Sequence, residues 1–157
     1  MASRNTSQEH LNEPYRLDQS LGYLLNRSAD IVSATFADIL KQEAISLPEW
    51  RVLTALTDRN DQTLSELAAH AGTELSYLSR IVLHAQERGL VYRFTSEEDK
   101  RSTHVSITAE GRALVRGVMP QARALEASWL EGISQQDVAS MRKTLQGSPI
   151  RHKVYRI

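Results

Sequence analysis

The side chains best suited to chemistry are hydroxyl, guanidinium and imidazole groups near the middle of the chain. Ser76, Tyr77, Ser79 and Arg80 stand close together, and His84 follows one helical turn later. Hydroxyls donate and accept hydrogen bonds, and an arginine can make a bidentate contact with guanine or clamp a phosphate. These residues therefore suit nucleic acid. The alternatives are that Arg80 braces another part of the chain, that Ser79 is a small spacer and that His84 is only solvated.

A second polar group is the mixed charge run 97–101. A guanidinium on a thin hairpin can enter a narrow minor groove, so Arg101 is a candidate for that contact. Asp99 is unsuited to phosphate, and its better role is to pair with an arginine such as Arg80 and fix the angle of the hairpin. Most such runs are solvated turns, and from the pattern alone that interpretation is the stronger one.

Several reaction classes lack the residues that they need. The chain has no cysteine, which excludes thiol nucleophiles, disulfides and Cys-ligated zinc. There is no His-Glu-x-x-His pair, phosphate-binding loop or nucleophile elbow. A site of His and carboxylates stays open, although no local spacing asks for one. We expect no enzyme activity, no cofactor and no metal. The histidines are scattered at His10, His70, His84, His104 and His152.

Composition predicts one compact unit without strong electrostatic bias. The chain has 157 residues, of which 41% are hydrophobic, and a formal net charge of +0. Residues 76–116 contain seven basic and five acidic side chains, so any positively charged surface for DNA is local and modest. No apolar run is long enough to span a membrane, and the polar N-terminus lacks a secretory signal. We expect a cytoplasmic protein.

Apolar periodicity predicts the elements that carry these residues. An amphipathic helix is expected over residues 17–43, and a second with Pro48 in its first turn. A third opens at Thr63, with Glu66 completing a capping box, and stops at Gly72.

The next helix ends at Gly89, where a left-handed cap residue is expected. Residues 90–94 and 104–108 then predict a β-hairpin with a polar tip. A long helix that Pro120 bends and a short helix capped at Ser134 follow. The buried face of the helix before Gly89 is predicted to be Leu78, Ile81, Val82 and Ala85.

This order of elements, and the residues within it, closely resemble the MarR (multiple antibiotic resistance regulator) family. The block 72–91 is similar to the family's recognition helix and first wing strand. The block 99–111 is similar to its wing signature, Asp, any residue, Arg, then a strand and a helix that opens with Thr and Gly. Residues 21–25 and 48–53 resemble its first two helices, so the resemblance covers nearly the whole chain.

The resemblance implies a mainly α fold with a small β-hairpin wing, a winged helix-turn-helix with long dimerisation helices. Residues 1–46 would form an N-terminal arm and dimerisation helix, 47–108 the DNA-binding region and 109–157 the C-terminal dimerisation helices and tail, in one compact domain overall. The terminal helices carry more apolar residues than a small winged helix needs to cover. An internal core uses part of this surface, and the resemblance favours a homodimer for the rest.

The resemblance also implies a sequence-specific transcription regulator, a repressor bound to a pseudo-palindromic operator. It favours Arg101 in the minor groove and Asp99 as the residue that braces the wing. The rival is a winged-helix module that binds proteins and has no DNA role. Arg80 and Arg101, in register on helix and wing, argue against that rival.

A small aromatic or phenolic effector is implied as well, bound between the dimerisation helices and the winged helix. Tyr23, Arg27, Trp50 and Arg51 could line its pocket, with an arginine meeting a carboxylate. The plainer interpretation places Trp50 in the core and the two arginines on the surface.

Overall fold

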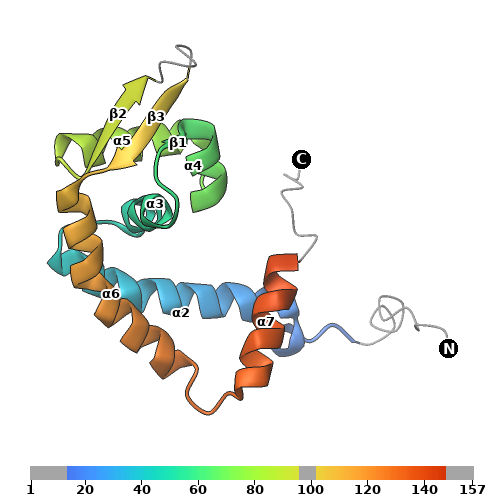
Figure 1. Ribbon diagram of the computed structural model, residues 1–157. Helices are drawn as coiled ribbons and strands as arrows, with labels where there is room; N and C mark the ends of the chain where they lie inside the picture. Colours follow the sequence, from blue (N-terminus) through green and yellow to red (C-terminus); the bar gives the residue numbers. More distant parts are fainter. Residues whose placement is uncertain (1–13, 96–101, 148–157) are drawn as a thin grey trace. The chain divides into compact units, whose positions relative to one another are not determined.

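The computed structural model describes residues 14–95 and 102–147. The chain divides into two compact units, residues 1–115 and 116–157. The predicted fold class is confirmed, because the described residues are mostly helical with one small antiparallel sheet (Figure 1). The helices of the first unit, before the one that continues into the second, are η1 (Leu17–Gln19), α2 (Leu21–Gln42), α3 (Leu47–Asp58), α4 (Leu64–Ala71) and α5 (Leu75–Glu87).

The first predicted helix begins later than expected. Residues Leu17–Gln19 form a single 3-10 turn, and Ser20 is extended (φ −68°, ψ 118°), so the α-helix starts at Leu21. Only the C-terminal part of α2 is buried, through Phe36 and Leu40. Most of the predicted apolar face of α2 therefore stays outside the core of the first unit.

Capping boxes start both α3 and α4. Thr63 and Glu66 form the predicted box, in which the Thr63 hydroxyl accepts from the Glu66 amide and the Glu66 carboxylate accepts from the Thr63 amide. Ser46 and Glu49 form a second box at α3, which we did not predict, and Pro48 lies in the first turn of α3 as expected. Each box satisfies amide donors that a helix start would otherwise leave without partners.

Helix α5 packs its predicted face against the core. Its buried residues are Leu78, Ile81, Val82 and Ala85, as expected. Gly72 (φ 64°) separates α4 from α5, and Gly89 (φ 69°) follows α5 as the predicted left-handed residue. These turns set the short connection of a helix-turn-helix.

The sheet consists of β1 (Gln62–Thr63), β2 (Val91–Thr95) and β3 (Thr103–Ile107) in the order β1-β3-β2. The predicted hairpin is confirmed, with Val91 opposite Ile107. Strand β1 was not predicted, because it is only two residues long and lies in a polar turn. Residues 96–101 of the hairpin tip lie outside the described residues.

Helix α6 (Ala109–Trp129) begins in the first unit and continues through Pro120 into the second, which also contains α7 (Gln135–Gly147). Ser134 caps α7 as predicted, since its hydroxyl accepts from the Asp137 amide at 3.1 Å. Helix α7 has no buried residue among its described positions, and Met141 and Leu145 are exposed. The apolar side of α7 therefore has little cover within the described chain.

Two glycines of α6 provide a matched test of packing at the start of this helix. A Cβ at Gly111 would overlap the carbonyl oxygen of Leu90 and lie 2.7 Å from Ile107 Cγ1, whereas a Cβ at Gly117 meets nothing within 4 Å. We expect Gly111→Ala to lower the free energy of unfolding by about 1–3 kcal/mol. Gly117→Ala should raise it by about 0.4–1 kcal/mol through helix propensity. Urea denaturation measures both, and equal stability of the two variants would contradict the close approach.

Candidate nucleic-acid interface

The face of α5 opposite its buried residues is open to solvent. Ser76, Arg80 and Leu83 are exposed and share this face, because they follow one another at spacings of four and three residues. Ser76 and Arg80 were predicted to contact DNA, and Leu83 was not. The structure therefore brings the predicted hydroxyl and guanidinium onto one free helix surface.

Tyr77 and Arg80 contact each other on this surface. The Arg80 guanidinium carbon lies 5.6 Å from the centre of the Tyr77 ring, a cation–π arrangement. Ser79 is only half-exposed, and its hydroxyl donates to the Leu75 carbonyl at 3.1 Å. That bond occupies the hydroxyl proton of Ser79, which favours the spacer alternative over a donor role for this residue.

His84 lies on a flank of α5, beside α3. Its Nδ1 is 2.7 Å from Glu49 Oε1, while 58% of the side chain remains exposed. Glu49 itself is 5% exposed. The predicted contact of His84 with DNA stays a prediction, and the structure adds a partner within the chain. The Ser46–Glu49 spacing could have revealed the capping box, but no local signal joins Glu49 to His84.

The Glu49 carboxylate keeps its charge through these contacts. Burial by itself raises the pKa of Glu49, but hydrogen bonds from the Ser46 backbone amide and the His84 ring outweigh burial and hold this pKa below its ordinary value. Arg88 Nη1 lies 3.5 Å from the same carboxylate. A buried anion thus meets His84 of α5 and Arg88, the residue that directly follows this helix.

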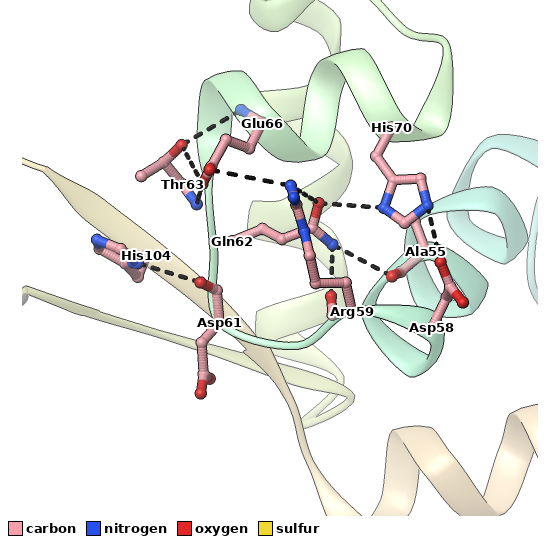
Figure 2. A network of polar contacts seen from close by, with 9 residues as sticks. All are labelled: Ala55, Asp58, Arg59, Asp61, Gln62, Thr63, Glu66, His70 and His104. Carbon is pink, nitrogen blue, oxygen red and sulfur yellow. Dashed lines mark hydrogen bonds and ion pairs between the residues drawn. The ribbon is translucent and has the colours of Figure 1, made fainter.

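A second buried polar residue, Gln62, joins α3 to α4 (Figure 2). Its amide nitrogen donates to the carbonyls of Ala55 and Arg59, at 3.2 and 2.5 Å. Its oxygen accepts from Arg59 and lies 3.1 Å from His70 Nδ1. His70 Nε2 is 3.2 Å from the Asp58 carboxylate. Because the Gln62 amide uses its donors and its acceptor oxygen, the corner between the two helices is well defined.

The turn beside Gln62 also anchors the wing. Asp61 adopts a positive φ of 54°, and its carbonyl lies 3.3 Å from His104 Nδ1 on β3 (Figure 2). The Ser106 hydroxyl donates to the Asp61 carboxylate. The Asn60 side chain accepts from the Ile107 amide at 3.0 Å. These bonds tie β3 to the turn that follows α3.

The other wing strand is tied to α5 directly, since Arg93 on β2 donates to Gln86 at 2.6 Å. Arg101 and Asp99 lie outside the described residues, so their roles in the minor groove and in bracing the wing stay predictions. The described base of the wing nevertheless connects both to α5 and to the turn after α3.

The four predicted effector residues are divided between two helices, with Tyr23 and Arg27 on α2 and Trp50 and Arg51 on α3. Trp50 is buried with its ring against Phe36, 5.5 Å between centroids. Arg27 lies nine residues before Phe36 on α2, which is about 14 Å along a helix, and Tyr23 lies one turn earlier still.

Arg51 is exposed and lines a cavity of about 430 Å³ between α3 and α4. The other lining residues are Thr54, Ala55, Asp58, His70 and Ala71. Of the four predicted effector residues, Arg51 is the one that lines this cavity.

Residues 14–95 and 102–147 contain neither a metal-binding cluster nor a membrane-spanning helix. No group of three or more His, Asp or Glu side chains there could hold a metal ion. No helix in this part of the chain is long and apolar enough to cross a membrane.

Comparison with known proteins places these features in a family. The sequence profile of the MarR family matches residues 45–103. The solved MarR family transcriptional regulator SPO1453 of Silicibacter pomeroyi DSS-3 is 32% identical, with 85% of this chain and 95% of that one covered and a TM-score of 0.71.

Two further relatives are less identical over similar lengths. CouR of Rhodococcus jostii RHA1, solved with p-coumaroyl-CoA, is 27% identical, with 90% and 99% covered and a TM-score of 0.80. The transcriptional repressor IacR of Pseudomonas putida is 28% identical over 135 residues, 86% of this chain and 81% of that protein.

The lowered pKa of Glu49 predicts how stability depends on pH. A carboxyl whose folded pKa is depressed contributes stability above its unfolded value, here about 4.5, and loses that contribution as pH falls through the folded pKa. We expect the difference in free energy of unfolding between wild type and Glu49→Gln to be largest above about pH 5 and to shrink toward about pH 3. Chemical denaturation across this range measures it. A difference that does not change with pH would contradict the charged state of buried Glu49.

Proposed function

This chain belongs to the MarR family, and from that premise we propose that it is a transcriptional repressor whose homodimer binds a pseudo-palindromic operator in the cytoplasm. The observation that carries the proposal is the free face of α5, where Ser76, Tyr77 and Arg80 are exposed above a fully packed inner face. A helix of this kind can enter the major groove, where base edges display distinct donors and acceptors.

On the operator, Arg80 meets guanine or a phosphate while the hydroxyls of Ser76 and Tyr77 contact phosphate or base edges near the start of α5. The Tyr77 ring holds the Arg80 guanidinium before DNA arrives, which reduces the entropy lost on binding. Arg101 enters the minor groove beside the helix, and Asp99 braces the wing. The bonds from β2 and β3 to α5 and to Asp61 support such a wing at its base.

The homodimer is supported by apolar side chains that the chain leaves exposed. On α2, the exposed fractions of Leu21 and Ile31 are 71% and 56%, and on α7 that of Leu145 is 52%. Leucines on consecutive turns of long helices are typical of surfaces that pack against another helix. A dimer doubles the phosphate contacts and presents two copies of α5 to half-sites about one DNA turn apart.

We propose a small aromatic acid as the effector, with its carboxylate on Arg51. The cavity that Arg51 lines, about 430 Å³, is within the usual size of small-molecule sites. The Asp58 carboxylate, which lines the same cavity and pairs with His70, can accept a hydrogen bond from a phenolic hydroxyl. CouR, with its bound p-coumaroyl-CoA, supports the phenolic ring of such an effector, and the carboxylate is proposed from Arg51 alone.

DNA binding is tested by fluorescence anisotropy on a duplex that the wild-type protein selects from a random-sequence pool. We expect affinity to fall steeply between low and physiological salt, because binding releases counterions. Arg80→Ala and Arg101→Ala should each weaken binding by about 1–3 kcal/mol per contact with thermal stability retained.

Arg123→Ala on α6 removes the same charge outside the winged helix and should change little. If the wild-type protein selects no duplex, the module that binds only proteins becomes the better function.

The effector proposal is tested on the same duplex with p-coumarate and 4-hydroxybenzoate as probes. Either probe at millimolar concentration should weaken DNA binding about tenfold or more, a typical allosteric coupling. Cyclohexanecarboxylate, which carries the acid without the aromatic ring and hydroxyl, should have little effect. Arg51→Met should remove the response while leaving DNA affinity near wild type. An unchanged response in this variant would contradict the site.

A further inference from the structure

The two carboxylate oxygens of Glu49 have different partners. Oε2 accepts from the Ser46 amide and the Ser46 hydroxyl, both at 2.9 Å, which completes the start of α3. Oε1 faces α5 instead, at 2.7 Å from His84 Nδ1 and 3.5 Å from Arg88 Nη1. A glutamate used only for capping needs no partner on another helix. The contacts of Oε1 are therefore a separate function of this residue.

Arg88 extends the same contact to the end of α2. Its guanidinium donates to the carbonyls of Ala44 and Glu43, at 2.7 and 3.2 Å. These carbonyls follow the last turn of α2, where a cation also meets the negative end of the helix dipole. The flank of α5 thus contacts both sides of the corner between α2 and α3, through one buried carboxylate and two main-chain carbonyls.

The residues of this contact continue the row that reaches DNA. Arg80 and His84 on α5, and Arg88 directly after its last residue, follow one another at intervals of four, so they form one row with about 6 Å between neighbours. Apolar burial holds the inner face of α5 without strong directional preference. The charged contacts at one end of the row are directional, and they determine the angle at which Arg80 is presented.

We propose that Glu49 is a positioning residue for operator recognition, which fixes the angle of α5 relative to α2 through His84 and Arg88. The inference rests on the proposed function, in which α2 is a dimerisation helix. If α2 belongs to the dimer and α5 reads DNA, this joint sets the separation and angle of the two recognition helices. A stiff joint accepts one half-site spacing, whereas a loose joint tolerates several.

The experiment measures the affinity for the selected operator and for the same duplex with one base pair added between its half-sites. The insertion turns one half-site by roughly 35° and moves it by about 3.4 Å. Wild type should prefer the original spacing strongly. Glu49→Gln keeps an acceptor for the capping box but loses the charge, and we expect its preference to fall roughly fivefold or more. Because Glu49 is buried, a lost DNA contact cannot produce this change.

Ser46→Ala is the matched control, because it weakens the capping box and leaves the Oε1 contacts in place. It should lower stability and keep the wild-type spacing preference. His84→Ala should lower the spacing preference as Glu49→Gln does. The double variant that combines Glu49→Gln with His84→Ala should lower it no further. Loss of folded protein alone would reduce affinity for both duplexes equally, so the ratio separates positioning from stability.

The ratio of affinities for the original and the lengthened duplex measures the spacing preference. If this ratio in Glu49→Gln stays within about twofold of wild type, the positioning role is overturned. An equal loss of preference in Ser46→Ala would overturn it as well. If Glu49→Gln does not fold, Arg88→Met decides instead, because Arg88 also contacts Oε1 and is not among the residues predicted to contact DNA. Absence of DNA binding by the wild-type protein would refute the proposed function itself. Light scattering on each complex must return the mass of two chains plus one duplex for the ratio to report on spacing.

Discussion

A helix that offers one face to DNA must be held entirely by its other face and its flanks. In α5 the inner face is held by apolar burial of residues such as Leu78 and Val82, which sets how closely the helix packs. Apolar contact has little directional preference, so it specifies rotation and tilt less well. Directional polar bonds on the two flanks supply that information. Glu49 holds one flank through His84, and Arg93 of the wing holds the other through Gln86.

The contacts of Glu49 and Gln62 are effective because these two side chains are shielded from water. Glu49 and Gln62 are buried, and both have partners on more than one side. A buried polar group without its partner is costly, so only arrangements that satisfy every group are stable. Each residue lies where two elements meet, Glu49 near the end of α2 and Gln62 near the end of α3. The corners of the helix-turn-helix are therefore specified by polar contacts, and its interior by packing.

The same logic connects the surfaces on which the proposed function depends. Arg88, directly after α5, binds main-chain carbonyls at the end of α2, and α2 exposes leucines along its N-terminal half. The cavity at Arg51 lies on α3, whose first turn contains Glu49. The proposed dimerisation helix α2 and the proposed recognition helix α5 therefore both contact α3, which also lines the proposed effector cavity.

Much of the fold could be predicted because its signals are local. The capping box at Thr63, the buried face of α5 and the hairpin each depend on residues a few positions apart or on simple alternation. The start of α2 was placed too early, since one extended residue, Ser20, interrupts a continuous apolar pattern. Strand β1 was not predicted, because a strand of two residues is too short to show an alternation of apolar and polar side chains.

The sequence by itself determined the family, the order of the α-helices and the two hairpin strands, and the buried face of α5. Only the tertiary structure decided what holds α5 in place. His84 and Glu49 are 35 positions apart, and Ser106 and Asp61 are 45 apart. No pattern along the chain specifies such pairs, because they depend on how the helices and strands pack. The helical repeat predicts that His84 lies outside the buried face of α5. The charged group that its ring contacts depends on the neighbouring helix.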